Sequence, residues 1–199
     1  MLLDPEDSQL VLVDYQQRLM PALHDGSAAL ANACRLAHVA RALSVPVLAT
    51  EQNPAGLGHT VDPLRALLGP VLSKMDFSAA PVLLSRLRPA PKPVGGNARS
   101  LPRHLQKPAE PEPGRGTVVI AGCEAHVCLL QTALELLEEE FDVCVVTDAC
   151  ASRTERNRDA AFDRLAGAGA ELVTTEMVAF EWLRTAEHER FKEVLGWIK

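Results

Sequence analysis

The stretch TVVIAGCEAHVCLLQTALELLEEE, residues 117–140, joins an apolar strand to an amphipathic helix. Residues 117–122 are an apolar run of strand length, and residues 125–140 repeat apolar side chains at helical spacing along one stripe. A buried strand that leads straight into a helix is part of the unit from which parallel sheets are built. The stretch therefore predicts an α/β fold, with GCEAHVC, residues 122–128, at the turn between strand and helix.

The same alternation of strands and helices continues on both sides of this stretch. Strands are expected at residues 9–14, 45–51, 70–74, 117–122, 142–149 and 170–176. Helices are expected at residues 27–43 with Ser27 as N-cap, 62–69 with Asp62 as cap, 125–140, 154–169, 175–185 and 187–199. Because the strands are apolar on both faces and are separated by helices, we predict a parallel sheet with helices on both sides.

Length and charge narrow the class of protein. The 199 residues suit a single domain, 1–199, and the formal net charge of −6 without a basic stripe argues against a nucleic-acid partner. The Pro-rich segment at about 88–116 is expected to be a surface insertion, and an inter-domain linker is the alternative. The N-terminus lacks a secretory signal and no stretch could span a bilayer, so we expect a soluble protein of the cytoplasm or an organelle.

The five cysteines leave three readings of GCEAHVC open: a metal site, a disulfide or a nucleophile. An odd number of cysteines in such a chain argues against a disulfide framework, and Cys34 and Cys144 fit small core positions. A structural zinc site needs further grouped ligands, which the other histidines do not supply. His126 is interpreted as a structural or pocket-lining residue. Both the metal and the disulfide readings are therefore the weaker ones.

Three reactive side chains stand at three expected strand ends. Asp14 ends the first strand, Lys74 ends the third, and Cys128 lies just after the fourth. Ligands of open parallel sheets bind beyond the carboxyl ends of the strands, so these groups can meet if the fourth strand lies beside the first. Each alone has an ordinary explanation: a turn or ion-pair aspartate, a solvated lysine, a buried helix cysteine. Their coincidence at one edge favours a catalytic site.

The chemistry of these groups is that of an acyl-transfer hydrolase. Cys128 is expected in the first turn of a helix, where the dipole and a lysine favour a thiolate, so we predict a lowered thiol pKa. Asp14 could accept the thiol proton, and its negative charge opposes the lowering. Backbone N–H groups of the same turn could hold an oxyanion.

A resemblance to a known family rests on five stretches that span nearly the whole chain outside the Pro-rich segment. They are LVLVDYQ (10–16), VPVLATEQNPAGLGHTV (45–61), LSKMDFSA (72–79), VVIAGCEAHVCLLQTALELL (118–137) and VVTDACASR (145–153). Together they resemble the isochorismatase-like cysteine hydrolases, which include nicotinamidase and N-carbamoylsarcosine amidohydrolase. TEQNPAGLG and TDACASR are most similar to the branch labelled isochorismatase domain-containing protein, whose substrates are poorly defined.

The resemblance implies a catalytic triad with Cys128 as nucleophile, Asp14 as base and Lys74 as charge stabiliser. It also implies a cis peptide between Cys123 and Glu124, which would turn the Glu124 and Cys128 N–H groups toward the oxyanion. We expect a three-layer α/β/α fold with six parallel strands in the order 3-2-1-4-5-6, and assembly into a dimer or larger homo-oligomer. The aromatic side chains of the C-terminal segment support assembly; they are Phe180, Trp182, Phe191 and Trp197.

Two departures from the family limit the substrate. Nicotinamidases carry metal ligands after the second strand, where this chain has TEQNPAGLG and only His59 further on, so we predict no metal and no cofactor, and nicotinamide is disfavoured. Isochorismatases lack the nucleophilic cysteine, so Cys128 argues against isochorismate. We predict C–N hydrolysis of a small amide or ureido compound through a thioacyl-enzyme, with an ester or thioester hydrolase, or a non-catalytic scaffold, as alternatives. Gln16, Gln52 and Phe77 are candidate pocket residues, with packing roles equally open.

Overall fold

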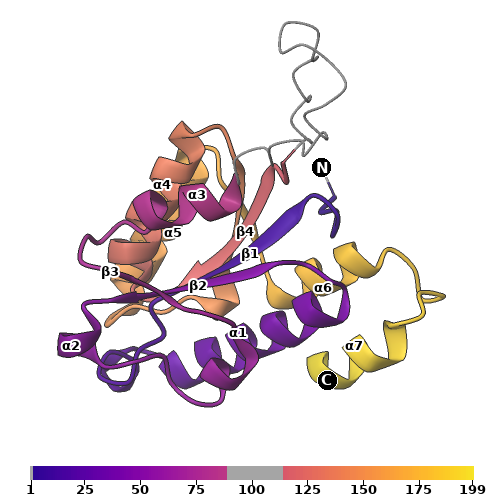
Figure 1. Ribbon diagram of the computed structural model, residues 1–199, viewed down its shortest axis with the longest axis horizontal. Helices are drawn as coiled ribbons and strands as arrows, with labels where there is room; N and C mark the ends of the chain where they lie inside the picture. The colour runs from indigo at the N-terminus through magenta and orange to yellow at the C-terminus, as the bar shows by residue number, and fades with distance from the viewer. Residues whose placement is uncertain (1, 89–113) are drawn as a thin grey trace, which may run out of the picture.

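Six parallel strands form one sheet in the computed structural model, which describes residues 2–88 and 114–199. Their order is β3-β2-β1-β4-β5-β6, so the predicted order and fold class are confirmed (Figure 1). The strands are β1 (Ser8–Val13), β2 (Val47–Gln52), β3 (Leu72–Lys74), β4 (Thr117–Gly122), β5 (Asp142–Val146) and β6 (Glu171–Val173). The order of the strands reverses between β1 and β4, which is the place where such sheets bind ligands.

Helices cover both faces of the sheet (Figure 1). One face carries α1 (Gly26–Ala42), α6 (Thr175–Leu183) and α7 (Phe191–Ile198). The other face carries α3 (Ala80–Leu87), α4 (Leu130–Glu138) and α5 (Glu155–Gly167). Shorter pieces are α2 (Pro54–Leu57), the 3-10 turns η1 (Met20–Ala22), η2 (Leu64–Leu67) and η5 (Thr147–Ala149), and the π-helical turn η4 (Ala125–Leu129). In the described ranges, no helix is long and apolar enough to cross a membrane.

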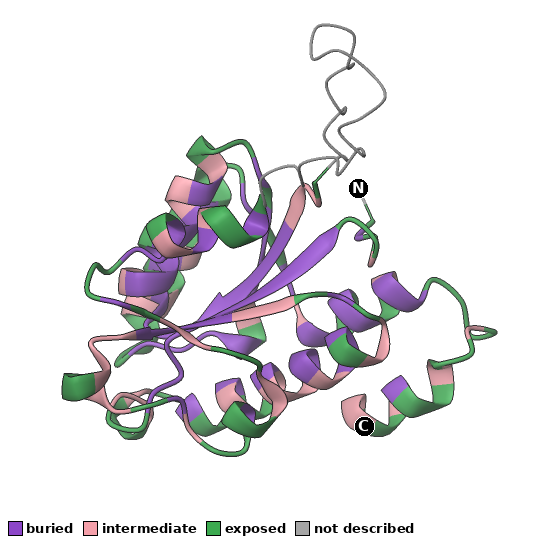
Figure 2. Cartoon of the chain, in the orientation of Figure 1, coloured by how far each residue is buried: buried purple, intermediate pink, exposed green. Residues whose placement is uncertain are grey.

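The central strands β1 and β4 lie in the middle of the core (Figure 2). Every residue of β1 is buried, as is every residue of β4 after Thr117. The two strands come close at their ends, where Val13 pairs with Gly122. A Cβ atom at Gly122 would lie 2.5 Å from the Cβ of Val13. Only glycine permits this approach, which sets the residues after Val13 and Gly122 side by side.

The predicted elements differ from the observed ones mainly at their ends. The strand expected at 142–149 stops at Val146 and continues as η5, and the strand expected at 170–176 covers only Glu171–Val173. The helix expected at 62–69 is reduced to the short η2. Because apolar periodicity does not mark where backbone pairing stops, these boundaries could not be read from the sequence.

Helix starts were also partly wrong. Asp25, and not Ser27, is the N-cap residue of α1. Helix α3 was not among the expected helices; its Pro81 stands in the first turn, where proline is well tolerated. The Pro-rich segment predicted at about 88–116 lies outside the described residues from 89 to 113, so its role as an insertion in a single domain stays a prediction.

Candidate active site

The side chains of Asp14, Lys74 and Cys128 meet at the carboxyl edge of the sheet. Asp14 follows β1, Lys74 is the last residue of β3, and Cys128 lies in η4 directly after β4. Lys74 Nζ donates to Asp14 Oδ2 over 2.6 Å, and the Cys128 thiol lies near enough to both side chains for each of them to shift its pKa. Three residues that are far apart in sequence therefore form one contiguous group.

Asp14 is held rigidly by its surroundings. It is fully buried and has a left-handed backbone with φ of 57°, a conformation that aspartate tolerates better than most residues. One carboxylate oxygen binds Lys74, and the other accepts a hydrogen bond of 2.7 Å from Thr50 Oγ1. Thr50 was not among the predicted site residues, and its only signal in the sequence is a hydroxyl within an apolar strand.

Lys74 is buried, and its side-chain nitrogen donates hydrogen bonds to three protein oxygens. Besides Asp14, its Nζ donates to the carbonyl oxygens of Asp76 at 3.3 Å and Phe77 at 3.0 Å. The residue is only 5% exposed. Because a buried charge is stable only with partners, the backbone of residues 76–77 helps to hold the cation beside Asp14.

Cys128 lies in a widened helical turn, and not in the regular α-helical turn that the sequence predicted. The Leu129 N–H donates to Glu124 O over 3.3 Å, a π-helical bond between residues five apart, and α4 starts only at Leu130. Single π-turns of this kind are frequent at functional sites. The turn leaves the Cys128 side chain slightly exposed, at 6%.

The prediction of a lowered thiol pKa at Cys128 is wrong. Burial, followed by the charge of Asp14, raises the pKa of the Cys128 thiol to about 12, and Lys74 acts in the opposite direction without reversing the shift. The sequence suggested the opposite because the helix terminus and the lysine are visible in it and the desolvation is not. At neutral pH Cys128 is therefore a neutral thiol beside Asp14, and any attack by its sulfur would need a proton acceptor.

The peptide bond between Cys123 and Glu124 is cis. Within the described residues, the Glu124 N–H donates no hydrogen bond to a carbonyl or side chain. The Glu124 carboxylate accepts from the Arg153 N–H at 3.0 Å and from Arg153 Nε at 2.9 Å, which fixes the turn to the segment after η5. Only the backbone of Glu124 was predicted to act at the site, and no local pattern in the sequence indicates the bond of its side chain to Arg153.

The other cysteines have no comparable neighbours. All five are free thiols, so the disulfide reading of GCEAHVC is excluded. Cys123 is fully buried, and burial raises its thiol pKa well above the usual value. Cys144 is buried in β5 as expected for a core residue, whereas Cys34 is half-buried on α1.

The three candidate pocket residues occupy different environments. Gln16 is fully buried, and its amide bonds the backbone of Gln52 in both directions and the carbonyl of Gly58. These contacts favour the packing alternative for Gln16. The Gln52 side chain donates to Met75 O over 3.0 Å, and Phe77 is 52% exposed two residues beyond it.

The region after β2, where the resemblance to nicotinamidases led us to look for metal ligands, contains a buried carboxylate with protein partners. Glu51 accepts hydrogen bonds from the Thr60 N–H and Thr60 Oγ1, and its second oxygen lies 3.1 Å from His59 Nδ1. Burial tends to raise the pKa of Glu51, but these hydrogen bonds hold it below its usual range. Through these contacts the Glu51 carboxylate holds the loop of residues 52–60 in place.

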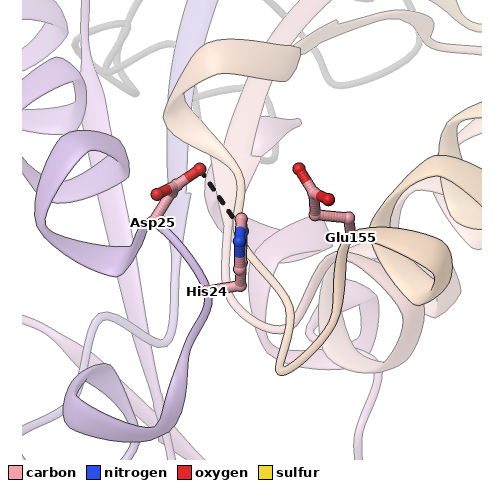
Figure 3. Close-up of side chains that lie close together, drawn as sticks. All are labelled: His24, Asp25 and Glu155. Carbon is pink, nitrogen blue, oxygen red and sulfur yellow. Dashed lines mark ion pairs between the residues drawn. The ribbon is translucent and has the colours of Figure 1, made fainter.

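A cluster of possible metal ligands lies elsewhere on the surface (Figure 3). One ligand atom from each of His24, Asp25 and Glu155 lies within 4.8 Å of the others. All three residues are exposed, and His24 Nδ1 already lies 3.3 Å from Asp25. Exposed groups of this kind are common without an ion, so the cluster by itself does not indicate a metal site.

Two other features lie outside the group formed by Asp14, Lys74 and Cys128. His126 Nδ1 lies 3.0 Å from Ser152 Oγ, in keeping with a structural role. A surface hollow of about 450 Å³ lies next to α6 and is lined by residues including Met177 and Phe180. None of its lining residues belongs to the triad, so the chemistry, and not the size of the hollow, identifies the candidate active site.

Comparison with known proteins gives consistent matches. A family model described as Isochorismatase domain matches residues 8–90 and 105–177. Isochorismatase domain-containing protein 2A of Mus musculus is 37% identical over 195 residues, which cover 98% of this chain and 84% of the mouse protein.

Solved structures share the fold. A structure of MAR1 ribonuclease from Caenorhabditis elegans matches with a TM-score of 0.84 and 32% identity, covering 100% of this chain and 92% of that chain. YcaC from Pseudomonas aeruginosa, with hexane-2,5-diol and covalent acrylamide, and YcaC from Escherichia coli, described as an octameric hydrolase of unknown specificity, each match with a TM-score of 0.77 and 26% identity. They cover 98% of this chain, and this chain covers 90% and 87% of them.

Proposed function

The chain belongs to the isochorismatase domain family, and from this premise and the geometry of its candidate active site we propose that it is a cysteine hydrolase. Its substrate would be a small amide or ureido compound, cleaved at a C–N bond through a thioacyl-enzyme. The family and its neighbours support a hydrolase of this fold. The observation that carries the finer proposal is the ion pair of Asp14 and Lys74 at 2.6 Å, near enough to Cys128 for both groups to shift the pKa of its thiol.

Acylation begins with a neutral thiol, since the Cys128 pKa is about 12. As Cys128 Sγ attacks the substrate carbonyl carbon, Asp14 accepts the thiol proton, and the C=O electron pair moves to oxygen. The N–H groups of Glu124 and Cys128 would stabilise this oxyanion. The tetrahedral intermediate then collapses, the C–N bond breaks, and Asp14 returns the proton to the leaving nitrogen.

Deacylation uses the same base a second time. Asp14 takes a proton from water as the water oxygen attacks the thioester carbon, and the C–S bond breaks. The proton then passes to the Cys128 sulfur and restores the thiol. Lys74 stays paired with Asp14 and with two backbone carbonyls throughout, so it stabilises negative charge near the sulfur without moving.

A covalent adduct in a relative supports a reactive nucleophile in this fold. The P. aeruginosa YcaC structure contains covalent acrylamide, and acrylamide is an electrophile that reacts with thiolates. We infer the same reactivity for Cys128 in this chain. Esters and thioesters would be attacked by the same group, so they form the alternative substrate class.

The ribonuclease activity in the name of the C. elegans relative is a different candidate for this chain. A net charge of −6 does not favour binding of a polyanion, because nucleic-acid affinity depends mainly on phosphate contacts with Lys and Arg. A small uncharged carbonyl compound therefore fits this chain better than RNA.

We also propose that the chain self-associates, on evidence other than its C-terminal aromatic residues. The E. coli YcaC relative is octameric, which supports a homo-oligomer here. The aromatic residues that first suggested assembly are mostly used within the chain: Trp182 is buried and donates to Ser8 Oγ, and Trp197 stacks on His38. Phe180, 43% exposed, remains available on the surface. Light scattering at micromolar concentration would test this, and a monomer would contradict it.

A library of small amides, ureides, esters and thioesters tests the function directly. The wild-type protein should release amine or ammonia from at least one amide or ureide, and intact-mass spectrometry should detect the acyl adduct on Cys128. Cys128→Ala should abolish both signals. If Cys128→Ala hydrolyses the same substrate at the wild-type rate, the thiol mechanism is wrong, and if only esters react, the alternative substrate class applies.

A further inference from the structure

Helix α4 and the turn before it direct a polar stripe toward the segment that holds Lys74. Cys128, Thr132 and Glu135 are spaced four and three residues apart, which puts them on one helical face. Glu135 Oε2 accepts a hydrogen bond of 2.7 Å from Ser78 Oγ, and Thr132 Oγ1 accepts one of 2.8 Å from the Ala79 N–H. This face therefore binds the chain immediately after Asp76 and Phe77.

Thr132 makes a second bond toward the nucleophile. Its hydroxyl donates to the Cys128 carbonyl oxygen over 2.6 Å. A threonine within a helix often bonds the carbonyl four residues earlier, and such a bond alone would be local. Here the same oxygen also accepts from a residue 53 positions away, and Thr132 is fully buried. One hydroxyl thus joins the nucleophile's backbone to a separate segment of chain.

The segment bound by Thr132 is the one that positions the lysine. Asp76 O and Phe77 O accept two of the hydrogen bonds of Lys74 Nζ, and the third goes to Asp14. Only Ser78 separates these carbonyls from the Ala79 N–H that Thr132 accepts. A shift of residues 76–79 away from α4 would therefore move two of the three acceptors of the ammonium.

We propose that Thr132 is a positioning residue, which fixes Lys74 against the Cys128 sulfur by binding the segment 76–79 to the backbone of the nucleophile. This rests on the proposed function only in taking Cys128 as the nucleophile. Without the hydroxyl, the buried Ala79 N–H loses its acceptor and the segment is free to move. The ammonium then stabilises the thiolate less well, so the thiol should ionise and react less readily.

The test is the pH profile of iodoacetamide alkylation at Cys128, read peptide by peptide with mass spectrometry. Thr132→Val keeps the shape of the side chain and removes the hydroxyl. We expect the Cys128 profile to move to higher pH by about one unit, so that the rate at pH 9 falls about tenfold. Thr132→Ser restores the hydroxyl and should return the rate to within about twofold of wild type.

Thr175→Val is the matched control for a lost buried hydroxyl. Thr175 is also buried in a helix, and its Oγ1 donates to Asp148 over 2.9 Å, away from the triad. Thr175→Val should lower the melting temperature without changing the pH profile of Cys128 alkylation. Ser78→Ala, which removes the neighbouring bond to Glu135, gives a second variant if Thr132→Val does not fold, and it should slow alkylation about threefold, in keeping with a partly loosened segment.

The proposal is overturned if folded Thr132→Val alkylates at the wild-type rate or faster, or if Thr132→Ser fails to rescue it. It is also overturned if Thr175→Val moves the profile equally, since general loosening would then explain the effect. The readout needs no substrate. A Cys128→Ala protein that still hydrolyses its substrate would therefore refute the proposed function and leave the alkylation result on Thr132 standing.

Discussion

The turn after β4 and the strand β5 each hold a buried thiol, Cys128 and Cys144, and the two differ in their neighbours. Burial raises the pKa of both thiols to about 12. The charged side chains around Cys144 are the acids Glu171, Asp142 and Glu181, which raise its pKa further. Cys128 instead lies near Asp14 and Lys74, which shift its pKa in opposite directions and are bound to each other at 2.6 Å.

This difference teaches that the pKa of a resting thiol does not identify a nucleophile. Two thiols with equal pKa values carry equal fractions of thiolate at any pH. What separates them is a group that can take the proton during attack and a cation that stabilises the sulfur anion. Cys128 has both a carboxylate and an ammonium group nearby. We therefore expect Cys128 and Cys144 to have similar thiol pKa values and different reactivity.

The largest expected effect is on hydrolysis. Cys128→Ala should lower kcat for a hydrolysed substrate by at least about a thousandfold, because no other group can form the acyl-enzyme. Cys144→Ala should change kcat by less than about threefold, since it removes only a small core side chain. Steady-state kinetics on both purified variants measures this. Equal losses in the two variants would break the comparison between the two sites.

The next largest effect concerns the cation. Lys74→Met should destabilise the protein by about 3–5 kcal/mol, because it leaves Asp14 as a buried carboxylate without its charge partner. The exposed pair Arg190–Glu193 is the control, and Glu193→Gln should cost less than about 1 kcal/mol. Urea unfolding gives both values. A loss below about 1 kcal/mol in Lys74→Met would mean that Asp14 does not depend on Lys74.

A third prediction uses pH to show the thermodynamic likeness of the two thiols. Their pKa values are raised from 9.0 in the ordinary state to about 12 in the folded state. Between pH 9 and 12 the unfolded chain therefore binds fewer protons than the folded one, and stability falls as pH rises. Each thiol contributes up to about 1.4 kcal/mol per pH unit to this slope.

Urea unfolding between pH 8 and pH 10.5 measures the slope, and the variants separate the thiols from other groups that titrate there. Cys128→Ala and Cys144→Ala should each flatten the slope to a similar extent. If only Cys144→Ala flattens the slope, the pKa of Cys128 in the folded state is closer to its ordinary value. The lowering of that pKa by Lys74 would then outweigh the raising by burial and by Asp14.

The smallest effect is expected at the other cysteine of GCEAHVC. Cys123 is fully buried beside the cis peptide and makes its contact with β1 through its backbone N–H, which donates to Val13 O over 2.9 Å. Cys123→Ser keeps that bond and should lower kcat less than about tenfold, with a stability loss of about 1–2 kcal/mol from the buried hydroxyl. A loss as large as that of Cys128→Ala would reassign the nucleophile to this position.

Much of the architecture could be predicted because it depends on local patterns. Alternating apolar strands and amphipathic helices indicated the parallel sheet, and the polar residues Asp14, Lys74 and Cys128 stood where those runs ended. Given the strand order, the carboxyl ends of parallel strands must meet at one edge. That is why the sequence predicted that these three distant residues lie together.

The details that decide the chemistry depended on contacts that no local pattern contains. Thr50 at Asp14, the carbonyls around Lys74 and the hydroxyl of Thr132 are brought to the site from separate segments. The π-turn that carries Cys128 has the same residue types as an ordinary helix start. These features arise when distant segments pack, so the periodicity of one segment does not report them.

The sequence by itself therefore determined the fold class and placed Asp14, Lys74 and Cys128 at the ends of strands that meet at one edge. Tertiary structure alone decided how these side chains are aligned and how the Cys128 thiol titrates. The clearest case is Cys128, whose thiol pKa was predicted to fall and instead rises to about 12. Residue types reveal which charges are near, but the cost of removing a thiolate from water depends on how completely the surrounding chain excludes it, and only the packed molecule sets that.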